Sequence, residues 1–85
     1  MSSAVRLRLL TRPDCGLCKE MARDLTKLGL AFDTIDIEGD PRLLERFGEA
    51  IPVLMDGDRE IARAPQTAES LRRALAREGL LPAGR

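Results

Sequence analysis

The stretch Thr11-Arg12-Pro13-Asp14-Cys15-Gly16-Leu17-Cys18-Lys19 contains both cysteines of the chain, three positions apart. It lies between a predicted strand at residues 5–10 and a predicted helix at residues 17–28. One helical turn brings positions i and i+3 within the Cα separation of roughly 4.4–6.8 Å that a disulfide needs. The first turn of a helix also has unpaired N–H groups and the positive end of the helix dipole, and both stabilise a thiolate. Because the thiolate is the attacking species in disulfide exchange, this placement predicts a thiol–disulfide oxidoreductase.

The length and composition are those of one small globular domain. An 85-residue chain has room for a single hydrophobic core, so residues 1–85 are predicted to form one domain. Apolar residues make up 44% and charged residues 33%, which is typical of globular proteins. Two cysteines cannot form the dense disulfide framework of a small secreted domain, so core packing must stabilise the fold.

The charge pattern argues against nucleic-acid and membrane partners. Lys and Arg number 14 and Asp and Glu also 14, so there is no basic excess to neutralise phosphates. Arg6 and Arg8 interrupt the apolar run that a signal peptide would need, and no apolar run approaches the roughly 20 residues of a membrane span. We therefore expect a cytoplasmic protein, where a Cys-x-x-Cys pair is more often catalytic or metal-binding than structural.

The first half of the chain reads as strand, helix and strand. Alternating apolar residues predict the strand at residues 5–10, whose shared face would comprise Val5, Leu7 and Leu9. The helix at residues 17–28 has its apolar residues at helical spacing: Leu17, Met21, Leu25 and Leu28. Gly29 follows as a natural C-terminal cap, and a second strand is predicted at residues 30–37. Since one helix connects the two strands, they should be parallel.

The second half predicts a short helix and a third strand. Asp40 and Pro41 have the residue types preferred at an N-cap and at the first helical position, and Gly48 would end this helix. The third strand, residues 51–55, has proline at its second position.

A hairpin and a last helix complete the chain. Asp56-Gly57 predicts a hairpin turn, so residues 59–63 should return antiparallel. Thr67 is the predicted N-cap of the last helix, whose core face would comprise Ala68, Leu71, Ala74 and Leu75. The predicted order is β-α-β-α-β-β-α, an α/β fold around a mixed four-stranded sheet.

This order, with Cys-x-x-Cys after the first strand and a proline opening the third, resembles the thioredoxin fold and, within it, the minimal glutaredoxin-like group. Residues 10–18, Leu-Thr-Arg-Pro-Asp-Cys-Gly-Leu-Cys, resemble the glutaredoxin active-site signature. Ile51-Pro52-Val53 stands where that family has its cis-proline, and Asp56-Gly57 where its hairpin turns. The resemblance extends over residues 5–76 and implies a mixed sheet flanked by helices.

The chemistry of the motif assigns different roles to the two cysteines. Cys15, at the exposed helix start, is the candidate nucleophile, and Cys18, one turn deeper, is the candidate resolving thiol. Cys15 would attack a substrate disulfide, and Cys18 would then release the resulting mixed disulfide. Helix N-termini in such motifs lower the cysteine pKa from about 8.5 to roughly 3.5–7.5. Arg12 and Lys19 should lower the pKa of Cys15 as well, whereas Asp14 should oppose them.

The resemblance also implies a substrate platform beside the cysteines. A cis bond before Pro52 would turn the Ile51 main chain toward an extended peptide or glutathione. The expected substrate-binding residues are Arg12, Pro13, Gly16, Leu17, Lys19, Ile51 and Pro52. The side chains that could bind glutathione's carboxylates are Arg12, Lys19, Arg59 and Arg63. A solvated surface charge is the alternative interpretation of each of these four.

Two departures from the glutaredoxin pattern concern glutathione. Gly16-Leu17 stands where the family usually has an aromatic residue inside the motif. Residues 62–67, Ala-Arg-Ala-Pro-Gln-Thr, do not match the glycine pair and acidic residue that hold glutathione's γ-glutamyl end. We therefore expect weak glutathione binding, with glutathione at most a co-substrate, and no permanently bound cofactor. The expected partner is a disulfide-containing protein or glutathione, and the expected state is a monomer.

Other classes of protein remain open. A structural zinc site takes four ligands, and this chain has two cysteines and no histidine, so no metal site within one chain is expected. The resemblance leaves open a [2Fe–2S] cluster shared between two subunits with glutathione, or a metal-delivery module. A non-catalytic adaptor with this fold is the remaining alternative.

Overall fold

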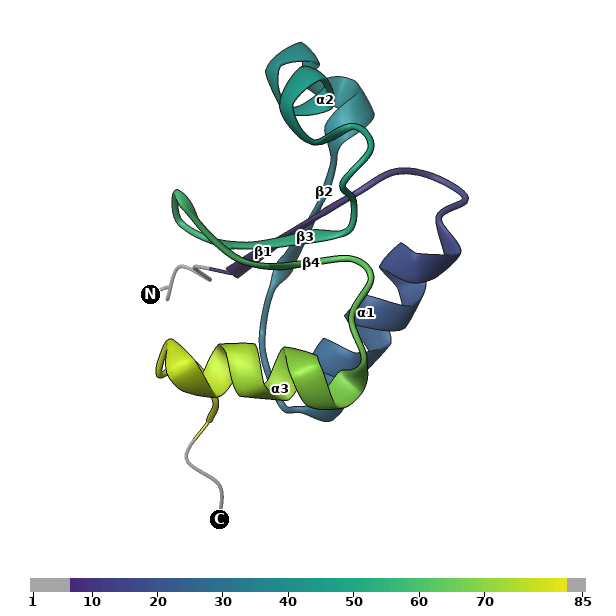
Figure 1. The fold of residues 1–85 in the computed structure, drawn as a ribbon. Coiled ribbons are helices and arrows are strands. Elements are labelled where there is room, and N and C mark those ends of the chain that lie inside the picture. Colours follow the sequence, from purple (N-terminus) through teal and green to yellow (C-terminus); the bar gives the residue numbers. More distant parts are fainter. Residues whose placement is uncertain (1–6, 83–85) are drawn as a thin grey trace.

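The computed structural model describes residues 7–82 and arranges them in three layers (Figure 1). The elements along the chain are β1 (Leu7–Thr11), α1 (Gly16–Lys27), β2 (Asp33–Asp36), the 3-10 helix η1 (Ile37–Gly39), α2 (Pro41–Phe47), β3 (Val53–Asp56), β4 (Arg59–Arg63) and α3 (Ala68–Arg77). The strands form one sheet in the order β2-β1-β3-β4. β1 and β2 are parallel, whereas β1–β3 and β3–β4 are antiparallel. This confirms the predicted element order and the mixed four-stranded sheet.

Helices cover both faces of this sheet. α1 and α3 lie on one face and α2 on the other (Figure 1). The core under α1 and α3 consists of Leu7, Leu9, Met21, Leu25, Leu54, Ala62, Leu71, Ala74 and Leu75. The core under α2 consists of Leu10, Ile37, Phe47, Val53 and Met55. The central strand β3 is buried on both faces, so its apolar residues Val53, Leu54 and Met55 run consecutively, whereas β1 keeps Arg8 exposed between the buried Leu7 and Leu9. Val5, predicted to extend β1, lies outside the described residues.

The caps of α1 and α2 agree with the sequence analysis. α1 begins after its N-cap Cys15 and ends at the C-cap Leu28, and Gly29 follows with a φ of +82°, a left-handed conformation that favours glycine. Asp40 caps α2 by accepting hydrogen bonds from the main-chain N–H groups of Arg42 (3.0 Å) and Leu43 (3.4 Å).

α3 also begins at its predicted cap. Thr67 and Ser70 cap this helix reciprocally through side chain and main chain. One core prediction is wrong here, because Ala68 is exposed. It lies in the first turn of α3, and the buried residues of this helix begin only at Leu71.

Several strand boundaries differ from those predicted: β1 extends to Thr11, β2 begins only at Asp33, and β3 extends to Asp56. β2 ends at Asp36, because the Asp36 side chain accepts a hydrogen bond from the Glu38 N–H and turns Ile37 into η1. β3 begins at Val53, since Pro52 has no N–H to donate to a strand. The β3–β4 hairpin is confirmed, but Asp56 pairs with Arg59, so the turn is formed by residues 57–58. Gly57 supplies the positive φ of +61° that this turn requires.

No helix within residues 7–82 combines the length and apolar character that crossing a membrane would need.

Candidate functional site

Cys15 occupies the N-cap position of α1. Its backbone is extended (φ −104°, ψ 106°), and its Sγ accepts a hydrogen bond from the Cys18 N–H at 3.1 Å. The first helical hydrogen bond runs from the Lys19 N–H to the Cys15 carbonyl at 3.2 Å. The sulfur therefore satisfies one of the N–H groups that a helix start leaves unpaired, as a serine or aspartate side chain would. Asp14, with a φ of +59°, turns the chain from β1 into this position.

Cys15 and Cys18 form a disulfide, and the two cysteines differ in exposure. Their Cα atoms are 5.2 Å apart, within the range typical of disulfides. Cys15 is partly exposed, whereas Cys18 is only 4% exposed. An incoming sulfur could therefore approach Cys15 more readily than Cys18.

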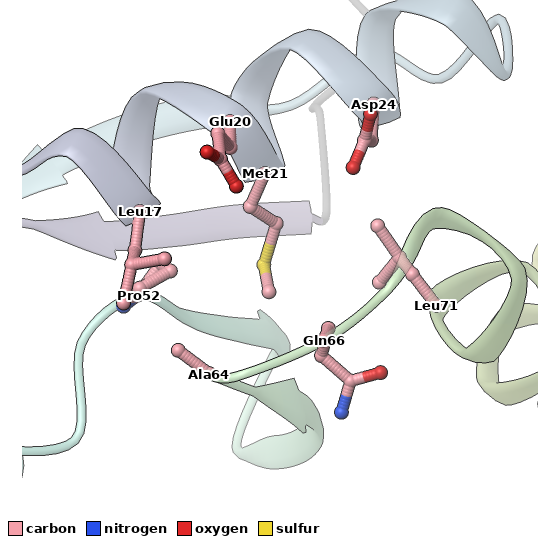
Figure 2. A pocket seen from close by; sticks show the side chains of 8 residues that line it. All are labelled: Leu17, Glu20, Met21, Asp24, Pro52, Ala64, Gln66 and Leu71. Carbon is pink, nitrogen blue, oxygen red and sulfur yellow. The ribbon is translucent and has the colours of Figure 1, made fainter.

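A small pocket lies along one side of α1. Figure 2 shows Leu17, Glu20, Met21 and Asp24 on the helix side, facing Pro52, Ala64, Gln66 and Leu71. Leu17 is 51% exposed, although the sequence placed it in the apolar stripe of the helix. The Ile51–Pro52 peptide is cis, as the resemblance implied, and the Pro52 carbonyl accepts a hydrogen bond from the Ala64 N–H at 3.0 Å. The pocket thus combines an apolar surface with two carboxylates.

A second cleft lies directly beside the cysteines. It is lined by Thr11, Arg12, Pro13, Asp14, Cys15, Cys18, Lys19, Ala22 and Thr34. The Thr11 hydroxyl donates a hydrogen bond to the Ile35 carbonyl at 3.3 Å, which ties the end of β1 to β2. Because both sulfurs border this cleft, a substrate bound in it would be next to the disulfide.

Arg12 connects the loop before the cysteines to the α2 side of the molecule. Its Nε is 3.0 Å from the Glu38 carboxylate, and its Nη1 donates to the Gly48 carbonyl at 3.3 Å. Lys19 forms no ion pair within residues 7–82. Of these two basic side chains, Lys19 is therefore the one whose charge is not already neutralised by a partner.

Arg59 and Arg63, the other candidate carboxylate ligands, border neither of the two concave surfaces beside α1. Arg59 pairs with Glu78 at 2.7 Å. Arg63 donates two hydrogen bonds to Glu60, at 2.6 and 2.7 Å. These bonds lower the pKa of the Glu60 carboxyl and raise the pKa of the Arg63 guanidinium. Both arginines thus have partners on the protein surface.

The structure brings most of the predicted site residues together. Arg12, Pro13 and Lys19 border the cleft that both cysteines line, and Leu17 and Pro52 border the pocket on the other side of α1. Gly16 is exposed at the first helical position, and apart from its chain neighbours and the backbone of α1 no atom lies within 4 Å of where a Cβ would be. Ile51 packs against the core under α2.

Two residues at the pocket, Glu20 and Asp24, were missed by sequence reasoning. Glu20 and Asp24 follow Leu17 at offsets of three and seven, so the helical spacing could have placed them on its side of α1. Ala64 and Gln66 belong to residues 62–67, the segment that the resemblance compared with the family's glutathione-holding residues, and they reach the pocket through tertiary packing.

A family profile and a known protein each match most of this chain. The family profile described as "Glutaredoxin-like domain (DUF836)" matches residues 6–76. The SPbeta prophage-derived thioredoxin-like protein YosR of Bacillus subtilis is 33% identical over 64 residues, which cover 71% of this chain and 80% of YosR.

Two solved structures overlap nearly the whole chain. The X-ray structure of protein XcR50 from X. campestris has a TM-score of 0.75 at 35% identity, covering 84% of this chain and 96% of that one. The glutaredoxin-like protein NrdH-redoxin from Escherichia coli has a TM-score of 0.67 at 24% identity, covering 93% and 99%. Together with the strand order, these overlaps confirm the predicted thioredoxin fold.

Proposed function

Because the chain belongs to the glutaredoxin-like domain family (DUF836), we propose that it is a thiol–disulfide oxidoreductase that works through Cys15 and Cys18. The observation that supports this most strongly is the asymmetry of the cysteine pair. One sulfur is partly exposed at a helix start, and the other is buried one turn deeper, within bonding distance. Dithiol exchange needs an accessible attacking thiol and a second thiol close enough to displace the captured half of the substrate.

The proposed reaction transfers two electrons from the protein to the substrate. In the reduced protein, the Cys15 thiolate attacks one sulfur of a substrate disulfide, and the other substrate sulfur leaves as a thiolate. Cys18 then loses its proton and attacks the Cys15 sulfur. The second substrate thiolate leaves, and the Cys15–Cys18 disulfide forms. Both substrate thiolates take up protons, so one disulfide is reduced as another is made.

Several residues would favour the attack of Cys15 on the substrate disulfide, which is the first step. The Cys18 N–H already donates to the Cys15 sulfur, and the same N–H would stabilise a thiolate there. Lys19, in the first turn of α1, adds positive charge near that sulfur. Leu17 and Pro52 would contact the substrate on one side, and Pro13 and Arg12 on the other. Gly16 leaves open space at the helix start for the approaching substrate, and Ile51 would present its main chain.

The partners follow from the same chemistry. The proposed substrates are disulfides of proteins or of glutathione, reduced by a cytoplasmic monomer that needs no permanently bound cofactor. The reductant that restores the dithiol would be glutathione or a thioredoxin-reductase-type enzyme. Parallel turnover assays, one with glutathione and its reductase and one with thioredoxin reductase, would identify which system sustains activity.

Replacing Cys18 with serine should trap the mixed disulfide. In this variant Cys15 can still attack, but no second thiol can release the product, so the protein should accumulate in a covalent adduct with half of the substrate. Intact-mass spectrometry after reaction with an oxidised peptide would measure the adduct, and dithiothreitol should reverse it. The double variant Cys15→Ser/Cys18→Ser is the matched control and should remain unmodified. Recovery of free Cys18→Ser protein, with the peptide disulfide intact, would contradict the assigned roles.

A further inference from the structure

The pocket between α1 and Pro52 has an acidic border. Glu20 and Asp24 lie one helical turn apart on α1, and both carboxylates lie along the apolar surface formed by Leu17, Met21 and Pro52 (Figure 2). Within residues 7–82, no lysine or arginine forms an ion pair with Glu20 or Asp24, although Lys19, Arg23 and Lys27 belong to the same helix. Neither carboxylate is therefore occupied by an ion pair, and both are available to a cation of an incoming molecule.

The start of α3, close to the same pocket, offers little to a substrate carboxylate. The Ser70 N–H donates to the Thr67 hydroxyl, and the Thr67 N–H donates to the Ser70 hydroxyl, both at 3.0 Å. Gln66 is also engaged, because its Nε2 donates to the Arg63 carbonyl at 3.1 Å and its Oε1 accepts from the Ser70 hydroxyl at 2.6 Å. These side-chain groups of Gln66, Thr67 and Ser70 are satisfied internally.

The arginines on neighbouring elements, Arg63, Arg72 and Arg73, do not line this pocket. Arg63 is held by Glu60, and both Arg72 and Arg73 are near the Glu69 carboxylate, at 3.3 and 3.7 Å. Lys19 borders the cleft on the cysteine side of α1 and does not line this pocket. A substrate that packs against Leu17 and Pro52 therefore meets an apolar surface with carboxylates at its border.

We propose that this surface selects polypeptide disulfides in which an apolar side chain next to the reacting cysteine is followed by a lysine or arginine. The inference rests on the oxidoreductase function proposed above and specifies its substrate. The apolar side chain packs on Leu17 and Pro52, and the cation lies near Glu20 and Asp24. Glutathione has two carboxylates and one ammonium group, so its net charge is negative and the same border disfavours it.

Three synthetic peptide disulfides would test this specificity. Each is the symmetric disulfide of a short peptide with Leu directly after Cys, and the three peptides differ only in having Lys, Gln or Glu after that Leu. The protein is reduced, freed of excess reductant and mixed with each peptide, and chromatography of acid-quenched samples gives the rate constant of reduction. We expect the Lys peptide to react about tenfold faster than the Glu peptide at low salt. About 0.5 M NaCl should reduce that ratio to roughly twofold, because salt screens exposed charges.

Variants that lack two carboxylates would show which acidic residues cause the difference in rate between the peptides. Glu20→Gln/Asp24→Asn should bring the Lys-to-Glu rate ratio close to one. Glu45→Gln/Glu49→Gln, which makes the same net-charge change beside α2, on the other face of the sheet, should keep the wild-type ratio. A wild-type ratio in Glu20→Gln/Asp24→Asn would overturn the proposal. An equal loss of the ratio in both double variants would also overturn it, since the effect would then come from net charge alone.

Two further substrates distinguish a failure of the proposed specificity from a failure of the proposed oxidoreductase function. Glutathione disulfide should react more slowly than the Lys peptide, and a faster reaction would overturn the specificity. Bis(2-hydroxyethyl) disulfide is small and neutral and needs no charge recognition. Reduction of that compound together with equal rates for the three peptides would refute only the specificity. Failure to reduce any of these disulfides would refute the oxidoreductase function itself.

Discussion

Replacing Cys15 with serine is expected to reduce disulfide reduction to the rate seen without protein. A serine hydroxyl is not ionised at neutral pH and cannot form a disulfide, so neither the attack nor the mixed disulfide is possible. Cys18 is only 4% exposed and cannot replace Cys15 as the attacking group. The measurement is a single-turnover reaction of the reduced protein with bis(2-hydroxyethyl) disulfide, followed by chromatography of the thiol product.

The control for this experiment is the fold of the variant. Serine is a good N-cap residue and can accept the Cys18 N–H bond that the Cys15 sulfur accepts in the structure, so α1 should remain intact. Thermal unfolding of Cys15→Ser should therefore match that of the reduced wild type, which also lacks the disulfide. A well-folded variant that still reduced the substrate would remove Cys15 as the nucleophile.

The largest effect on stability is expected from Leu25→Ala. Leu25 is 0% exposed and belongs to the core that α1, α3 and the sheet share. Truncating a buried leucine removes apolar burial and leaves a cavity, which costs about 2–5 kcal/mol of unfolding free energy. A small domain has only about 5–15 kcal/mol in total, so the loss would be a large fraction of the stability. Because the chain has no Trp or Tyr, urea unfolding should be followed by far-ultraviolet circular dichroism.

Leu44→Ala provides the same chemical change at an exposed position. Leu44 lies on α2 and is 37% exposed, so its replacement should alter the unfolding free energy by about 0.5 kcal/mol or less. If both variants unfolded at the same urea concentration, the core assignment of Leu25 would be wrong.

The sequence was sufficient to predict the fold because its local signals agree with one another. The spacing of Met21 and Leu25, the Asp40-Pro41 start and the Thr67 cap each have a local cause, and the structure confirms all of them. One error occurs where a side chain redirects the backbone. The Asp36 carboxylate ends β2 early by binding the Glu38 N–H, an interaction that apolar periodicity does not reveal.

The site could be predicted only in part, because some of its residues are distant from the cysteines in the sequence. The Cys15–Cys18 pair is a local motif, and its spacing on a helix start fixes its geometry. The pocket beside it also depends on Ala64 and Gln66, which are more than forty positions further along the chain and reach α1 only through the packing of β4 and α3. Local sequence patterns do not contain that kind of information.

The hydrogen bond between the Cys15 sulfur and the Cys18 N–H has a practical consequence for chemical labelling. An alkylating reagent converts the sulfur to a thioether, which is a weaker acceptor than a thiolate. Labelling would therefore weaken the first turn of α1 as well as block the sulfur. Experiments that use iodoacetamide to count reactive cysteines in this protein should record its melting temperature before and after modification.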